Sequence, residues 1–367
     1  MKRKFLLVSI ILYIACIFTG CSEQQQLHQK LIVQGISVDK ENETYKATIQ
    51  ALDFQNPASE DEPNIKIIEV QGQSIMEALD NISRKTSLRP VYSQNLILLL
   101  GEETAKSGVN DFIDFFVRHC ETRPKVKIAV CKGNASEILK IKSNEKSIKS
   151  KNIHDLIPME LNSDVLHFVS NLKNTKSDPW AAWLEIEEKD GNKEVNLKGV
   201  GVFSEDKLVD FWQDEDAFGF MVLKGVPEFG SCIINADNCG EVTCIINSSK
   251  PKTDVKIQEN RLPKFGINLD INASTFSLDK NFYTHEFEDI SQVIENKLSE
   301  KIGDICKNTM KKSLNMRIDV FEFSKILRNS YPRYFKKYEE KWTSILKRLE
   351  YEIIQNVKLK VTGKEPV

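Results

Sequence analysis

The chain has 367 residues, of which 51 are Lys or Arg and 53 are Asp or Glu, so its formal net charge is -2. A chain of this length is expected to form two or three domains, each able to bury its own core. Hydrophobic residues make up 41% of the chain, which excludes an intrinsically disordered protein. The balanced charge argues against a nucleic-acid-binding protein.

The first residues have the pattern of an export signal. Three basic residues at positions 2–4 precede an apolar run over residues 5–18, and the run is shorter than the about 20 residues that a membrane-spanning helix needs. The tetrapeptide of residues 18–21 resembles a bacterial lipobox, which predicts cleavage between Gly20 and Cys21 and a diacylglyceryl group on Cys21. The alternative is an uncleaved anchor with an incidental cysteine.

Loss of a signal over residues 1–20 would change both the charge and the location of the chain. The remaining 48 basic and 53 acidic residues give a net charge of -5. Two acyl chains, at roughly 0.8 kcal/mol per buried CH₂, suffice for stable anchoring. We therefore expect a water-soluble body held on the outer face of a membrane by Cys21.

Six cysteines would remain besides Cys21. Their even number in an exported protein permits disulfides, whereas the apolar residues around several of them favour buried free thiols, and both alternatives stay open. No CxxC motif occurs, so a zinc site is not favoured. The six are Cys120, Cys131, Cys232, Cys239, Cys244 and Cys306.

The first half alternates strand and helix signals. Residues 44–51 alternate between apolar and polar side chains, which predicts a half-buried strand that forms a hairpin with residues 31–38. Ser74 and Glu77 form a capping box at the start of a helix. Further strands are expected at 65–70, 96–100 and 126–130, and further helices at 109–116 and 165–172.

Two segments of this half read as irregular. The lysine-rich and serine-rich residues 140–151 predict an exposed loop. Residues 187–194 contain Asp190, Gly191 and Asn192, which indicates a connector between domains. The expected domains are therefore an N-terminal domain over 21–188 and a C-terminal region over 196–362.

The second half begins with strands and continues with helices. A hairpin is expected over 200–212, and Asp319 with Glu322 predicts a helix start. Trp342 lies on the apolar stripe of a later helix, so we expect it to be buried. Strands are expected at 242–247, 255–259, 265–273 and 351–361, helices at 289–305, 319–331 and 335–349, and a break between two subdomains near 275–288.

These patterns predict an α+β fold of two or three compact domains, each a small mixed sheet with helices packed on it. The chain lacks the HExxH, GxSxG and GxxxxGK[ST] motifs. We therefore expect no catalytic residue, no cofactor and no metal ligand. Residues 297–348 carry 14 basic and 6 acidic side chains, which indicates either solvated helix faces or a contact with anionic lipid or an acidic partner loop.

Several segments resemble the Ger(x)C lipoproteins, the C subunits of nutrient germinant receptors in endospore-forming bacteria. Residues 31–39 are similar to an apolar strand that ends in Gly-Ile-Gly-Ile-Asp, with Ser37 in place of a glycine. The residues after Cys21 differ from the Cys-Trp-Asp common in the family. The other similar segments are 72–79, 100–108, 114–118, 199–208, 319–323 and 331–335, together with Trp342.

The resemblance implies a non-enzymatic subunit of a germinant receptor that is needed for spore germination. It also implies polytopic A-type and B-type subunits as partners, and a position on the outer face of the spore inner membrane. From another class of protein, a cell-envelope lipoprotein that binds a solute or acts as a hydrolase is the alternative.

Overall fold

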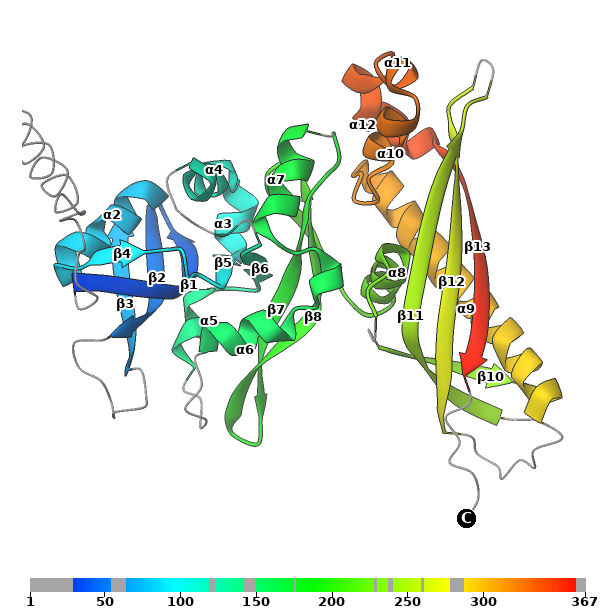
Figure 1. The fold of residues 1–367 in the computed structure, drawn as a ribbon, viewed down its shortest axis with the longest axis horizontal. Helices are drawn as coiled ribbons and strands as arrows, with labels where there is room; N and C mark the ends of the chain where they lie inside the picture. Colours follow the sequence, from blue (N-terminus) through cyan, green and yellow to red (C-terminus); the bar gives the residue numbers. More distant parts are fainter. Residues whose placement is uncertain are drawn as a thin grey trace, which may run out of the picture.

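The computed structural model contains two sheets with helices packed against each (Figure 1). It describes residues 29–53, 64–118, 123, 125–141, 149–174, 176–227, 230–236, 240–258, 261–277 and 287–360. The expected signal and its lipidation site Cys21 lie outside these residues. The arrangement confirms the predicted α+β class with more than one sheet-based unit.

The first sheet is mixed and has nine strands in the order β3-β2-β1-β5-β6-β7-β8-β9, with β4 also paired to β1. Its central strands β1, β5, β6 and β7 run parallel, and antiparallel strands flank them on both sides. The strands are β1 (Lys30–Glu41), β2 (Thr44–Asp53), β3 (Asn64–Gly72), β4 (Arg89–Val91), β5 (Ile97–Gly101), β6 (Lys127–Cys131), β7 (Trp180–Lys189), β8 (Asn192–Ser204) and β9 (Lys207–Trp212).

Local sequence signals explain the first part of this sheet. The alternating residues of β2 pair antiparallel with β1, as predicted. Every residue of β5 and β6 is buried, as expected for central strands with both faces covered. The capping box is also confirmed, because the Ser74 hydroxyl accepts a hydrogen bond from the backbone N–H of Glu77 at 3.1 Å, at the start of helix α2 (Ile75–Thr86).

Helices cover both faces of the first sheet. One face packs against α2, α3 (Glu102–Ser107), α4 (Asn110–Arg118) and α7 (Val165–Asn174). The other face packs against α5 (Ser136–Lys140), α6 (Lys149–Leu156) and η2 (Met159–Leu161). The prediction of a loop over 140–151 is therefore wrong at both of its ends, because Lys140 is the last residue of α5 and residues 149–151 belong to α6. Residues 142–148 lie outside the described part.

The structure corrects the expected connector over 187–194. These residues form the tip of the β7–β8 hairpin, in which Lys189 pairs with Asn192. As a result β8 and β9, which the sequence assigned to the C-terminal region, extend the first sheet. A hairpin turn and a domain connector have the same polar local composition, so composition alone does not distinguish them.

The second sheet has the strand order β10-β11-β12-β13. The long helix α9 (Phe287–Met316) packs along one face of it (Figure 1). Its terminal strand β13, predicted at 351–361, pairs in parallel with β12, so segments from both sides of the expected 275–288 break share one sheet. The strands are β10 (Ser231–Ala236), β11 (Gly240–Lys256), β12 (Lys264–Ser277) and β13 (Glu350–Lys360).

Several elements of this half differ from the expectation, and strand β10 (Ser231–Ala236) was not predicted. The strand expected at 242–247 and the start of the one expected at 255–259 belong to one continuous strand, β11, which ends at Lys256, and Pro251 is tolerated where β10 no longer pairs with β11. Helix α8 (Asp214–Lys224) was missed. The expected helix over 335–349 is divided into α11 (Pro332–Phe335), η3 (Glu339–Lys341), α12 (Trp342–Ile345) and η4 (Leu346–Arg348).

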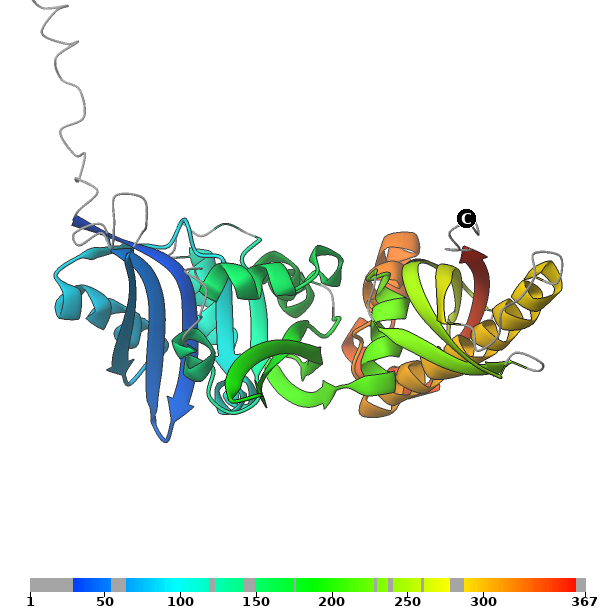
Figure 2. The ribbon, with the colours of Figure 1, turned by 90° about the horizontal axis from the view of Figure 1, so that it is seen from below.

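Helix α8 joins the two halves (Figure 2). Its apolar residues are buried, and Gly219 lies so close to α9 that an added Cβ would be 2.2 Å from the Thr309 hydroxyl. Phe220 contacts the rings of Trp180 and Trp212 from the first sheet and Phe321 from the C-terminal half. One hydrophobic core therefore continues from the first sheet into the second.

Candidate functional site at the interdomain junction

A buried group of charged side chains lies where the two halves meet. Lys224, the last residue of α8, donates a hydrogen bond to a carboxylate oxygen of Glu322 at 3.0 Å and another to the Val320 carbonyl at 3.1 Å. Its ammonium also lies 3.7 Å from the ring centroid of Trp180. The Lys224 and Glu322 side chains are only 11% and 17% exposed, so Lys224 is held by a carboxylate, a carbonyl and an aromatic face at once.

Two further side chains, Lys325 and His167, approach the same carboxylate. Lys325, on helix α10 (Phe323–Ser330), donates to Glu322 at 2.7 Å. His167 lies on α7 in the N-terminal half. Its Nε2 atom is 3.6 Å from Glu322 Oε1, and its ring packs on Trp180. Glu322 thus contacts groups from α7, α8 and α10.

Burial and charge act in opposite directions on these groups. Burial alone would raise the pKa of Glu322, but the charge of Lys224 and the hydrogen bond from Lys325 lower that pKa to about 2. Burial lowers the pKa of Lys224 and of His167, in each case against the attraction of Glu322. Glu322 is therefore an anion at neutral pH, and removing it would leave Lys224 buried without a counter-charge.

A second polar group holds the start of α10. One carboxylate oxygen of Asp319 accepts a hydrogen bond from Phe323 N–H at 2.8 Å, and the other accepts from Ser324 N–H and from the Trp342 indole N–H. Burial raises the pKa of Asp319 to about 7. The predicted helix start at Asp319 is wrong in position, because Glu322 is the N-cap and α10 begins at Phe323, but the Asp319 carboxylate accepts hydrogen bonds from the first two helical residues.

Asp178, just before β7, links this group to the first sheet. Its carboxylate accepts hydrogen bonds from the backbone N–H of Asp319 at 2.7 Å and of Glu205 at 2.9 Å. The Asp178 N–H donates in return to the Asp319 carbonyl at 3.2 Å, and the hydroxyls of Ser177 and Ser324 are 2.7 Å apart. The junction is therefore closed by backbone and side-chain bonds as well as by the apolar core.

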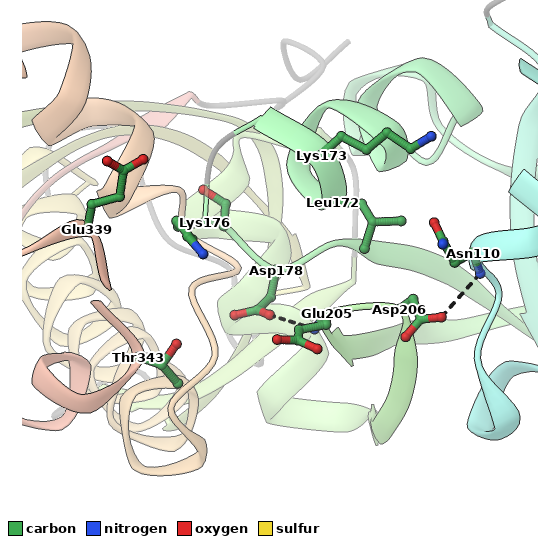
Figure 3. A pocket seen from close by; sticks show the side chains of 10 residues that line it. Asn110, Leu172, Lys173, Lys176, Asp178, Glu205, Asp206, Glu339 and Thr343 are labelled. Atoms are coloured by element: carbon green, nitrogen blue, oxygen red, sulfur yellow. Dashed lines mark hydrogen bonds between the residues drawn. The ribbon is translucent and has the colours of Figure 1, made fainter. Parts of the chain in front are cut away.

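Cavities open around the junction in the described part of the chain. The cavity in Figure 3 has a volume of about 450 Å³; Asp178, Glu205 and Asp206 lie together on its wall, and Lys173 and Lys176 also line it. A second, of about 720 Å³, includes His167 and Lys127, and a third, of about 280 Å³, includes Lys224 and Glu322. These cavities have mixed charge, and across the described ranges no group of His, Cys, Asp and Glu is arranged to hold a metal ion.

The residues that the sequence singled out lie in different parts of the fold. Cys120 and Cys239 lie outside the described residues, whereas Cys131, Cys232, Cys244 and Cys306 are buried and free. Trp342 is 1% exposed, which confirms its predicted burial. Within the described ranges, none of the helices combines the length and the apolar character needed to cross a bilayer.

The basic side chains of residues 297–348 differ in whether they contact acidic side chains or are exposed to solvent. Lys301 and Lys312 bind acidic residues of α8, namely Glu215 and Asp216. Lys336, Lys337 and Lys341 are exposed on the lobe formed by α11 and η3. We call these three exposed side chains the lysine cluster.

Sequence reasoning missed the junction. Lys224 and His167 are single polar residues beside apolar runs, a pattern shared with ordinary surface positions, and their partners are distant in sequence. The signal that could have pointed to the junction was the unusual Asp178, Pro179, Trp180 segment, in which an acidic residue directly precedes a buried strand.

Comparison with known proteins identifies the family. A model described as the spore germination protein N-terminal domain matches residues 23–186, and one described as spore germination B3/GerAC like, C-terminal, matches residues 198–363. The chain belongs to the Ger(x)C family of spore germination proteins. The two matched segments cover most of the chain and both halves of the fold.

Relatives of this family match over nearly their full length. The spore germination protein B3 of Bacillus subtilis (strain 168) is 24% identical, and the alignment covers 94% of both chains. The spore germination protein GerQC of Bacillus cereus is 22% identical over 99% of both. The crystal structure of the GerBC protein has the same fold, with a TM-score of 0.59 at 20% identity, and the match covers 90% of this chain and 97% of GerBC.

Proposed function

We propose that this Ger(x)C protein is a lipid-anchored, non-enzymatic subunit of a nutrient germinant receptor that is needed for spore germination. The observation that carries the proposal is the match of both family domains over residues 23–186 and 198–363. The lipobox at residues 18–21 supports the anchor. The structured body would then lie on the outer face of the spore inner membrane.

We propose polytopic A-type and B-type subunits as its partners. A tether on Cys21 would confine this chain and its partners to one surface, which raises their effective concentration without any new contact. The hydrogen bonds that close the junction around Glu322 support a further proposal. The two halves would move as one rigid unit, so a contact made by one half would change the position of the other.

Spores that lack this chain test the proposed function. We expect them to lose the response to the nutrients sensed by its receptor, and to keep the response to triggers that act downstream of all receptors. The fall in optical density of the spore suspension measures both responses. A normal response to every nutrient in the deletion strain would contradict the receptor assignment.

Cys21→Ala tests the anchor. The variant lacks the thiol that would receive the diacylglyceryl group, so the chain is expected to remain uncleaved or to move to the soluble fraction. Membrane fractionation followed by a high-salt wash measures the distribution. If a cleaved Cys21→Ala chain still sediments with washed membranes, another feature holds the protein there.

Charge reversal of the lysine cluster tests a partner surface. If Lys336, Lys337 and Lys341 contact an acidic partner loop or anionic lipid, their replacement by Glu should leave the fold intact and slow germination. The matched control reverses Lys250, Lys252 and Lys256, which are exposed on the second sheet. Co-purification of the polytopic subunits and the germination rate would be measured in both strains.

The two sets of variants give distinct outcomes. A slow response in the lysine-cluster strain alone assigns the contact to the lobe of α11 and η3. An equal effect of both triple variants indicates a general charge effect. Full recovery of the partners with an unaltered rate removes the lysine cluster from the interface.

A further inference from the structure

Two cysteines face each other across the edge of the second sheet. Strands β10 and β11 are antiparallel, and their register places Cys232 directly opposite Cys244. Side chains on β10 alternate between exposed and buried, so Cys232 and Cys244 share the inner face, where they are 4% and 0% exposed. Their sulfur atoms therefore lie on the same side of the sheet, toward the core under α9.

Their position satisfies most of the geometry that a disulfide needs. Directly opposed residues on antiparallel strands have Cβ atoms about 4.5 to 5.5 Å apart, and a disulfide needs about 3.5 to 4.5 Å. The two Cβ atoms would therefore need to move only slightly closer together for the disulfide to form. This approach requires movement of β10, a six-residue strand that lies at the edge of the sheet and, among the described strands, pairs with β11 alone (Figure 1).

The other described cysteines are not placed in this way. Cys131 lies on β6 in the first sheet, and Cys306 lies on α9. Both are buried, and neither is opposite a cysteine in the register of the described strands. Burial is therefore common to all four described cysteines. The position directly opposite each other on two paired strands is what distinguishes Cys232 and Cys244 from Cys131 and Cys306.

We propose that Cys232 and Cys244 are a dithiol pair that closes into a reversible disulfide across β10 and β11. The oxidant is a small or protein disulfide. When β10 opens from the sheet edge, the Cys232 thiolate attacks one sulfur of that disulfide and forms a mixed disulfide, which releases one thiol. The Cys244 thiolate then displaces the second thiol. One disulfide is reduced, two protein thiols are oxidised, and their two protons go to the released thiols.

The environment of the pair supports this order of attack and a slow reaction. Burial raises the pKa of both thiols, to about 11 for Cys244, whereas the charge of Lys301 opposes the rise at Cys232. Little thiolate is present while β10 is closed, so oxidation depends on opening of the edge strand. Once formed, the bond would tie the free edge of the sheet to its neighbour and close a ring of 13 residues, 232–244.

Peptide mapping of the full chain, extracted from membranes in detergent, tests the pair. The sample is treated with oxidised glutathione or with dithiothreitol, alkylated, and digested without reduction by proteases that cut before Asp and after Glu. Cleavage at Asp237 and Glu241 places Cys232, Cys239 and Cys244 on three separate peptides. We expect the Cys232 and Cys244 peptides to be joined after oxidation and separately alkylated after reduction.

Variants and melting temperatures complete the test. Cys232→Ser and Cys244→Ser should each abolish the joined peptide, while Cys306→Ser, a matched buried control, should keep it. Oxidised wild-type chain should melt roughly 5 °C above the reduced chain, and this difference should vanish in Cys232→Ser. Alkylation of both cysteines after oxidation, or pairing of either one with Cys239, would overturn the proposal.

Discussion

Trp342→Ala is expected to lower the free energy of unfolding by about 3 to 5 kcal/mol, because it empties a large aromatic site in a close-packed core. Trp342 is 1% exposed and packs against Phe335 at a ring separation of 5.6 Å. Its indole N–H also donates to the Asp319 carboxylate at 2.9 Å. Chemical denaturation of the purified chain, followed by circular dichroism, measures the change.

Trp342→Phe separates the two contributions. Phenylalanine keeps most of the ring in the core but removes the N–H that bonds Asp319, so a smaller loss of about 1 to 3 kcal/mol is expected. An unchanged denaturation midpoint for Trp342→Ala would contradict the buried position. Equal losses in both variants would mean that the hydrogen bond to Asp319 carries the whole effect.

Glu322→Ala is expected to lower the free energy of unfolding by about 3 to 5 kcal/mol, because it leaves Lys224 buried without its counter-charge. Lys224 would keep its contacts with the Val320 carbonyl and with the rings of Trp180 and Phe220, none of which carries a negative charge. Loss of the contact with His167 would also loosen the start of α10 from α7 in the N-terminal half. Denaturation and limited proteolysis of the segment between the two halves measure the two effects.

Two controls test this explanation. The double variant Lys224→Met with Glu322→Leu replaces the pair by apolar side chains of similar size, so most of the stability should return. Glu352→Ala breaks the exposed pair with Lys264, which should leave the free energy of unfolding nearly unchanged. If the double variant is no more stable than Glu322→Ala, the loss arises from the shape of Glu322 and not from an unpaired charge.

The sequence by itself determined the elements whose signals are local. The period of two over 44–51, the Ser74 and Glu77 capping box, and the apolar run at 96–100 each depend on neighbouring residues, and all three were confirmed. The buried position of Trp342 followed from helical spacing, even though the helix is divided into short pieces. The family resemblance also followed from residues along the chain.

Only the tertiary structure decided the elements that depend on distant partners. Helix α8 shows almost no amphipathic pattern because α9 covers one side of it and strands of both sheets pack on other sides, so apolar residues occur around it. The hairpin tip at 187–194 has the composition of a domain connector, and only its pairing to the first sheet distinguishes the two. The contacts of Glu322 with Lys224 and His167 join residues 98 and 155 positions apart, so packing of the two halves, and not any local pattern, creates the junction.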